Sequence, residues 1–292
     1  MNTIIFVMLM YKYIMNENCR RIFKFSMNYL MREIGENDLR RSAVIFSPHP
    51  DDETLGCGGT IIKKKRSDAD VKIVVVTDGS RSHSGFISKE ELKCMRARNA
   101  LGACHILGVS ESDVIFLEIE NGKLFENFYP AVHKIKEILV NLQPEEIFIP
   151  YYKEPLFWSE DHLATNRVVL SALNLSGLRM VVNEYPIGFW GHWPWTSTIS
   201  QDLWRRSLYA WKTYLFSGLH MLRDFRFFVP IKDVLEIKRA ALDQYTSQMT
   251  RLFSNPKWPI LEDVSKGEFL KCFFQDREFF RRYFFVNGNL IN

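Results

Sequence analysis

The sequence lacks the marks of several common protein classes. It has only five cysteines, an odd number, and no two of them have the Cys-x-x-Cys spacing of a thiolate zinc site. Scattered cysteines favour a reducing compartment over a disulfide scaffold, so we expect a cytoplasmic protein. No basic run is long and the net charge is only +4, which argues against a nucleic-acid partner.

Long hydrophobic runs are also absent. The apolar run 3–11 ends before Lys12 and is shorter than the roughly 20 residues that cross a bilayer. It also lacks the preceding positive charge and the small-residue cleavage site of a signal peptide. Residues 1–40 are therefore expected to be an N-terminal extension outside the chemistry, and residues 41–292 to form one domain.

What is present is an ordinary soluble composition, 47% hydrophobic and 25% charged. Short apolar runs predict strands, and helical periodicity fills the stretches between them. The predicted strands are 43–47, 71–77, 114–117, 146–150 and 180–185. The predicted helices are 57–66, 89–107, 128–142 and 162–173. This alternation indicates an α/β fold, with a Rossmann-like, mostly parallel sheet and helices on both of its faces.

Polar segments follow four of the predicted strands. Right-handed crossovers place the carboxyl ends of parallel strands at one edge of the sheet, where such folds bind ligands. The segments that reach this edge are 49–52, 78–83, 121–122 and 151–162. We expect them to converge on one crevice.

The string PHPDDE at 48–53 is the most informative part of the sequence. Imidazole nitrogen and carboxylate oxygen are ligands that suit zinc. His49 and Asp52 are three residues apart across a proline-fixed turn and can point at one ion. Asp51 cannot easily share that ion, but it can accept a proton from an activated water. The alternative is a helix N-cap beside an incidental histidine.

A catalytic zinc site typically has three protein ligands, so a third is needed. His162 follows the fourth strand, at a predicted helix start, and supplies it. Asp161 either orients His162 or caps the helix. The other histidines are weaker candidates. His105 and His133 lie in predicted helices, where they are expected to pack. His83 and His192 lie in loops that can enter the site.

Residues 47–61 (SPHPDDETLGCGGTI) resemble the signature of the LmbE/PIG-L family of zinc-dependent N-acetylglucosaminyl deacetylases. The similarity continues through these segments: Thr77–Gly79, Arg96, Asp161–Thr165 and Tyr245–Gln248. It therefore covers about residues 42–250.

This resemblance implies one zinc ion per chain, held by His49, Asp52 and His162, with Asp51 as the general base. Water activated at the metal attacks the amide carbonyl, and the metal stabilises the oxyanion. Substrate contacts are expected from residues around the crevice: Arg96, Asp78, His83 and Asn121.

The sequence departs from the family pattern in three places. Family members often carry a histidine three residues before the last ligand, where this chain has Ser159. Asn99 and Asn121 stand where acidic residues are usual. We expect Ser159 and Asp161 to lie beside the ligands, and His83 or His192 to be able to replace the missing histidine. These changes bear on rate and sugar recognition more than on metal binding.

Residues 186–230 are rich in aromatic and basic residues and predict an aromatic elaboration or lid. Three interpretations are open: a subdomain core, a lid that stacks on sugars, or a patch at a membrane interface. The apolar, basic residues 1–25 would add to such a patch. The aromatic tail, 269–285, is expected to form a packed terminal helix.

The predicted function is zinc-dependent hydrolysis of the N-acetyl group of an amino sugar, either a small molecule or linked to lipid. A lipid-linked substrate would place the protein peripherally at the inner membrane face. Alternative substrates are a thiol-precursor glycoside and a nucleotide sugar. An alternative of another class is a zinc-containing carbohydrate-binding protein without turnover, which Ser159 favours and Asp51 opposes.

Overall fold

The computed structural model describes residues 29–154, 160–191, 195–196, 222–286 and 288–291, together with residues 18, 21, 25 and 220. The expectations for Ser159 and His192 lie outside the described residues. The expectations for residues 1–40 and for the aromatic elaboration 186–230 also concern mostly residues that the structure does not describe. No helix in the described ranges combines the length and apolarity that crossing a membrane requires.

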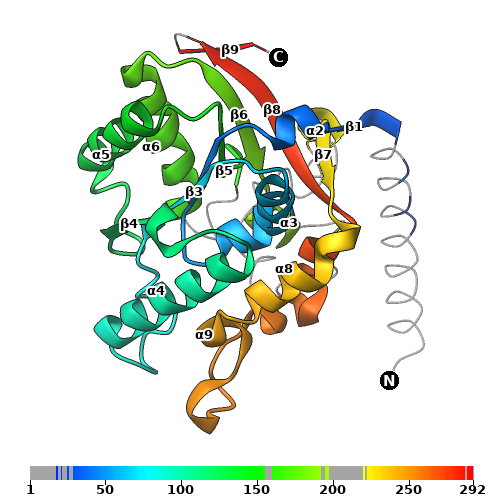
Figure 1. The fold of residues 1–292 in the computed structure, drawn as a ribbon. Coiled ribbons are helices and arrows are strands. Elements are labelled where there is room, and N and C mark those ends of the chain that lie inside the picture. Colours follow the sequence, from blue (N-terminus) through cyan, green and yellow to red (C-terminus); the bar gives the residue numbers. More distant parts are fainter. Residues whose placement is uncertain are drawn as a thin grey trace, which may run out of the picture.

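The described chain forms a nine-stranded sheet with the order β1-β7-β8-β6-β5-β2-β3-β4, and β9 pairs with β8 (Figure 1). The strands are β1 Arg32–Glu33, β2 Ala43–Ser47, β3 Val71–Thr77, β4 Val114–Ile119, β5 Glu146–Pro150, β6 Met180–Tyr185, β7 Phe227–Pro230, β8 Arg277–Val286 and β9 Asn289–Ile291. All pairings among β2 to β6 are parallel. The predicted Rossmann-like α/β fold is confirmed.

The sheet order reverses between β2 and β5. From β2 the chain moves outward to β3 and β4, then returns to form β5 and β6 on the other side. The connections after β2 and β5 therefore diverge and leave a crevice at the carboxyl ends of these two strands. The segments that begin at His49 and that lead to His162 both lie at this point.

Helices cover both faces of the sheet (Figure 1). The helices are α2 Glu36–Leu39, α3 Asp52–Arg66, α4 Lys89–Ile106, α5 Phe128–Leu142, α6 Glu160–Ser176, α8 Leu235–Leu242, α9 Thr246–Met249 and α10 Glu268–Lys271. Ile45 of β2 joins the core under α3, α4 and α8, whereas Val44 and Phe46 join the core under α5 and α6. Side chains alternate across a strand, which is why continuous apolar runs fill two cores.

Residues 269–274 of the tail expected to be helical are helical, in α10 and the 3-10 helix Cys272–Phe274, but from Arg277 the tail forms β8 instead. Its ten residues pair antiparallel with both β6 and β7 and so extend the sheet beyond the parallel strands. Aromatic residues favour strands when they pack against a sheet surface, and Phe280 and Tyr283 are buried there. For β8 the helix prediction was wrong because tertiary pairing decided the structure of this aromatic segment.

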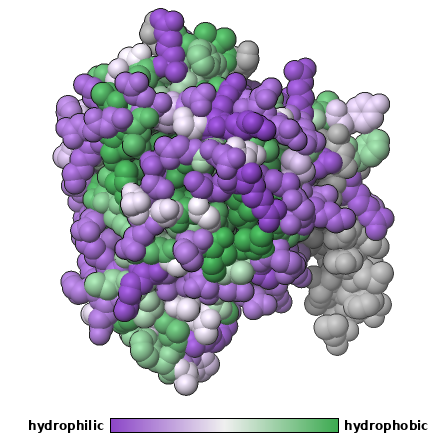
Figure 2. All heavy atoms as spheres, viewed as in Figure 1, coloured by the Kyte–Doolittle hydropathy of each residue, from purple (hydrophilic) through white to green (hydrophobic). Residues whose placement is uncertain are grey.

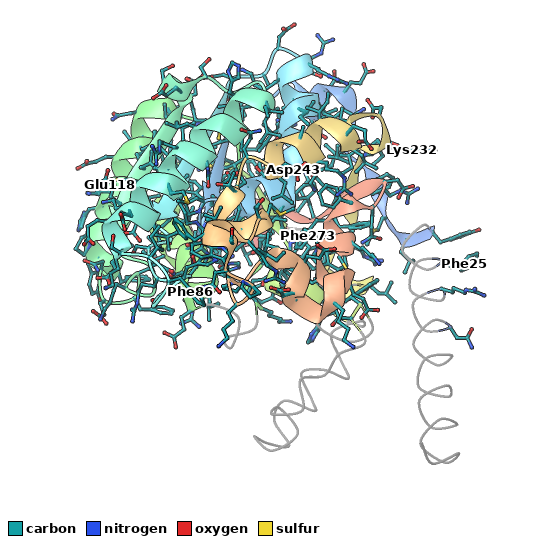
Figure 3. All side chains as sticks on the ribbon, turned by 90° about the horizontal axis from the view of Figure 1, so that it is seen from below. Phe25, Phe86, Glu118, Lys232, Asp243 and Phe273 are labelled. Atoms are coloured by element: carbon teal, nitrogen blue, oxygen red, sulfur yellow. The ribbon has the colours of Figure 1, made fainter. Side chains whose placement is uncertain are left out.

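A buried ion pair ties the C-terminal elements to α3. Glu278 of β8 accepts hydrogen bonds from Gly59 N, Thr60 N and Thr60 Oγ1 of α3 at 2.8, 2.7 and 2.6 Å. Lys238 of α8 completes the group, with its Nζ 2.7 Å from Glu278 Oε1 and 2.8 Å from Leu55 O. Figure 3 shows α8 beside α3, between the labelled Lys232 and Asp243.

Gly59 allows this close approach. A Cβ at this position would lie 2.4 Å from Ile231. A side chain there would therefore push the C-terminal elements away from α3. On the outside, polar residues cover much of the face in Figure 2, with apolar residues scattered between them.

Candidate active site

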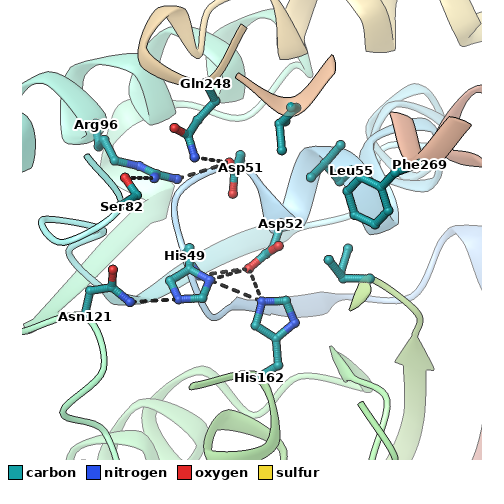
Figure 4. A pocket seen from close by; sticks show the side chains of 12 residues that line it. His49, Asp51, Asp52, Leu55, Ser82, Arg96, Asn121, His162, Gln248 and Phe269 are labelled. Carbon is teal, nitrogen blue, oxygen red and sulfur yellow. Dashed lines mark hydrogen bonds and ion pairs between the residues drawn. The ribbon is translucent and has the colours of Figure 1, made fainter. Parts of the chain in front are cut away.

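Three ligand-type side chains meet at the crevice between β2 and β5. Their donor atoms, from His49, Asp52 and His162, all lie within 4.8 Å of one another. His162 Nε2 is 3.2 Å from both His49 Nδ1 and Asp52 Oδ2, and His49 Nδ1 is 3.1 Å from Asp52 Oδ2 (Figure 4). Two imidazole nitrogens and one carboxylate oxygen are a donor set that could hold a divalent metal ion.

Asp161 orients His49 rather than its neighbour in sequence. Asp161 Oδ2 lies 3.3 Å from His49 Nε2 and accepts hydrogen bonds from Gly122 N at 2.6 Å and Asn121 Nδ2 at 2.8 Å. A carboxylate on one imidazole nitrogen fixes the ring and directs the other nitrogen toward a metal. Here the nitrogen so directed is His49 Nδ1.

The surrounding charges favour a cation at this point. Burial alone would lower the pKa of His49, but hydrogen bonds and charges from Asp161 and Asp52 outweigh it and raise the pKa to about 10. Burial opposes ionisation of Asp52, yet His162 and His49 hold its pKa well below the usual range. A buried group that favours positive charge and contains an ionised carboxylate is suited to bind a metal ion.

Asp51 occupies the turn between the two ligands of the motif. Its φ of 131° is one that L-residues rarely adopt, and its backbone N is 3.2 Å from Glu53 Oε2. Glu53 is itself fixed, because it accepts hydrogen bonds from Ser47 Oγ at 2.8 Å and from the Tyr245 hydroxyl. The turn therefore holds Asp51 at the start of α3 in a conformation in which its side chain does not cap the helix. Burial raises the pKa of Asp51 to about 7, although Arg96 opposes the shift.

Arg96 lies behind Asp51 and is 2% exposed. Its Nη2 is 3.1 Å from Asp51 Oδ2 and also donates to the Pro50 carbonyl, while Nη1 donates to Ser82 Oγ at 3.0 Å. Gly79, with φ of +65°, makes room for this side chain, because a Cβ there would lie 2.7 Å from Arg96 Nε. The sequence predicts Arg96 as a substrate contact, and the structure adds a direct contact with the proposed base.

The two remaining candidates from the sequence, Asp78 and His83, contact the loops around the site rather than the cavity itself. Asp78 Oδ1 accepts hydrogen bonds from Ser80 N and Asn121 N, both at 3.0 Å, and so braces the loop that carries Asn121. His83 stacks on Trp258 with ring centroids 4.3 Å apart, and its Nε2 lies 2.9 Å from the Pro259 carbonyl oxygen. Neither Asp78 nor His83 is among the described residues that line the cavity.

A cavity of about 250 Å³ opens above these groups. The described residues that line it are His49, Asp51, Asp52, Leu55, Ser82, Arg96, Asn121, His162, Ile187, Gln248, Leu261 and Phe269 (Figure 4). Gln248 places its amide beside both Asp51 and Arg96, with Nε2 3.3 Å from Asp51 Oδ2. The opposite orientation of the amide would accept from Arg96 Nη1 at 2.8 Å.

Sequence reasoning gave no role to several residues of this site. Leu261 and Phe269 reach the cavity from the far end of the chain, and no local pattern marks them. Glu154 is buried behind His162, with Oε2 3.9 Å from His162 Nδ1, and accepts hydrogen bonds from Ile187 N and Phe189 N. Burial raises the pKa of Glu154 to about 7. In the sequence, Glu154 is marked as a site candidate only by its charge and by its place in the predicted loop 151–162.

Fold and site define a Rossmann-like α/β protein with a two-histidine, one-carboxylate group at the point where the sheet order reverses. The model of the PIG-L family, described as GlcNAc-PI de-N-acetylase, matches residues 44–173 of the chain. This range contains the predicted ligands and the predicted base.

Curated relatives and a solved structure are also similar to this chain. The chain is 26% identical over 231 residues to the diacetylchitobiose deacetylase of Thermococcus kodakarensis, a match that covers 77% of this chain and 75% of the relative. It is 27% identical over 154 residues to a probable N-acetyl-alpha-D-glucosaminyl L-malate deacetylase 2 of Bacillus cereus, covering 51% of this chain and 66% of the relative. The N,N'-diacetylchitobiose deacetylase of Pyrococcus horikoshii has a similar fold, with a TM-score of 0.59, 19% identity, and coverage of 95% of this chain and 93% of that chain.

Proposed function

We propose that this protein is a zinc-dependent N-deacetylase that hydrolyses the N-acetyl group of a GlcNAc-type amino sugar. The observation that carries the proposal is the convergence of His49, Asp52 and His162 in one cavity with the buried carboxyl group of Asp51. The match to the PIG-L family model supports the reaction class. Two relatives whose names specify N-acetylated sugars support the substrate class.

A zinc ion bound by His49, Asp52 and His162 would supply a Lewis acid that polarises the amide carbonyl and acidifies water. Asp51 accepts a proton from the attacking water and returns it to the departing amine nitrogen, so that water adds across the C–N bond and yields acetate and a free amine. A pKa near neutrality suits both halves of this transfer.

Positioning of Asp51 is the second requirement. Arg96 and Gln248 hold the carboxyl group of Asp51 from the side away from the ligands. A base whose rotamer is fixed does not have to be ordered during the reaction, and this lowers the barrier. Polar groups of Ser82 and Asn121 remain on the same side of the cavity to meet the hydroxyl groups of a sugar.

Which amino sugar is the substrate, and whether it is linked to lipid, depends on residues outside the ligand group. A lipid-linked sugar, with contact at the inner membrane face, remains a prediction from residues 1–25 and 186–230. A thiol-precursor glycoside and a nucleotide sugar use the same chemistry and are distinguished by the panel below.

The test is release of acetate from a panel of N-acetylglucosaminyl compounds by zinc-loaded protein. The panel contains N-acetylated forms of four compounds: diacetylchitobiose, a malate glycoside that is a thiol precursor, a nucleotide sugar and a glycolipid. Asp51→Asn should retain about one zinc per chain but lower turnover roughly a hundredfold or more. Loss of zinc in this variant would make Asp51 a ligand. Absence of acetate release from every compound by the zinc-loaded protein would reject the proposed function.

A further inference from the structure

The cavity has two chemically different sides. His49, Asp51 and Asp52 form its base, and Ser82, Arg96 and Asn121 lie on one side (Figure 4). The described apolar lining residues, Leu55, Ile187, Leu261 and Phe269, form what we call the apolar wall. Figure 4 shows Leu55 and Phe269 next to one another, on the side of Asp52 away from Arg96 and Asn121.

The apolar wall begins immediately beside the ligand group. Leu55 follows Asp52 by three residues in α3, so both side chains project from the same face of the helix. Phe269 of α10 lies behind Leu55, with exposed fractions of 1% and 3% respectively. Ile187, which follows β6, is 1% exposed. Packed side chains of this kind form a fixed surface rather than one that rearranges around each ligand.

We propose that the apolar wall receives the acyl group of the substrate and that the protein accepts acyl chains longer than acetyl. This inference rests on the proposed function. A substrate amide bound at the ligand group has two substituents: the sugar, with its hydroxyl groups, on the nitrogen, and the acyl chain on the carbonyl carbon. Hydroxyl groups against the apolar wall would lose hydrogen bonds to water without replacement, so the sugar takes the polar side.

The extent of the apolar wall argues for a longer chain. A single acetyl methyl group next to the amide carbon contacts only the part nearest the ligands, around Leu55. Leu261 of the short helix Leu261–Gly267 and Phe269 add surface that acetyl does not need. Each further methylene buried there increases affinity by roughly two- to fourfold. Ile187, Leu261 and Phe269 lie outside residues 44–173, so this preference is a property of the C-terminal region.

The test compares N-acetyl-, N-propionyl- and N-butyrylglucosamine as the same glycoside. Binding is measured by calorimetry with zinc-loaded Asp51→Asn, and turnover with the unchanged protein. We expect affinity and kcat/KM to rise from acetyl to butyryl by roughly fourfold to sixteenfold. Leu261→Gln should remove the rise and Leu261→Ala should reduce it. Leu252→Gln is the matched control, because Leu252 is equally half-buried nearby but does not line the cavity.

The outcomes separate this inference from the proposed function. Tighter binding of the butyryl compound without hydrolysis of any compound would support the apolar wall and reject the deacetylase. Hydrolysis of the acetyl compound with equal or weaker binding of the butyryl compound would overturn the inference alone. An equal loss for all three compounds in Leu261→Gln would show that this wall holds another part of the substrate.

Discussion

Residues 44–173 and residues 174–291 contribute different properties to one cavity. The first region supplies the groups that carry the proposed chemistry, among them His49, Asp51 and His162, and they lie at the ends of parallel strands. The second region supplies much of the apolar wall, and Gln248. Sheet topology thus places the reactive groups, whereas the shape of the cavity depends on elements that come later in the chain and pack against the sheet.

The two regions also differ in how they are held. The groups of the first region are fixed largely by hydrogen bonds within that region, such as Ser47 to Glu53 and Gly122 to Asp161. The second region is attached to the first where the buried pair Lys238–Glu278 meets α3, with Glu278 accepting from Gly59 N and Thr60 N and Lys238 donating to Leu55 O, and through parallel pairing of β6 with β5. Damage to the first region should therefore affect chemistry, and damage to this attachment should affect stability.

The largest expected effect comes from removing a ligand. His162→Ala should lower bound zinc from about one per chain to near zero and reduce deacetylation by at least roughly a thousandfold, because the Lewis acid is lost. Elemental analysis and acetate release measure the two effects. His105→Ala, an exposed histidine of α4, is the control and should change neither. Full zinc occupancy in His162→Ala would show that the ligand set is different.

The second prediction breaks the attachment between the regions. Lys238→Met leaves the carboxylate of Glu278 buried without its counter-charge, which typically costs about 3–5 kcal/mol of unfolding free energy. Lys63→Met removes an ion pair between α3 and Asp233 that lies at the surface, and should cost at most about 1 kcal/mol. Urea denaturation measures both.

A further variant tests the cause of this loss. Lys238→Met combined with Glu278→Gln should recover much of the stability, because no buried charge then remains unpaired. Equal losses in Lys238→Met and Lys63→Met would show that the buried pair does not hold the regions together.

The same division explains what could be predicted from the sequence. The five parallel strands followed from apolar runs, and the approach of His162 to the motif residues His49 and Asp52 followed from topology, since strand ends meet at one edge of the sheet. Long-range packing carries no such signal. Phe280 and Tyr283 gave the wrong prediction of a terminal helix because β8 is stabilised by pairing with strands far away in sequence.

Within the site, the sequence spacing predicted which residues lie near the crevice, but not always which partner each side chain contacts. Asp161 was expected beside His162, yet its carboxylate lies against His49. Asp78 and His83 follow β3 as expected, but their side chains bond to neighbouring loops. Residues that follow a strand reach the correct edge, whereas the direction of each side chain depends on turns that no periodicity describes.

The smallest expected effect tests whether a residue of the second region also contributes to catalysis. Gln248 is the polar side chain from the second region that lines the described cavity, and its amide bonds to Asp51 in one orientation and to Arg96 in the other. Gln248→Ala should lower kcat by about tenfold, as expected for one hydrogen bond to a charged group, with KM and zinc content nearly unchanged. Gln244→Ala, one turn earlier and exposed, is the control and should have no effect.

The separation of kcat from KM makes this result informative. If Gln248 only fixes Asp51, substrate affinity stays and the reaction slows, because the base is less well ordered in the transition state. If Gln248 binds the sugar, KM rises and kcat stays. An unchanged kcat and KM would assign all polar chemistry to residues 44–173 and leave the second region with the apolar wall alone. A loss as large as that of Asp51→Asn would instead place part of the catalytic machinery in the second region.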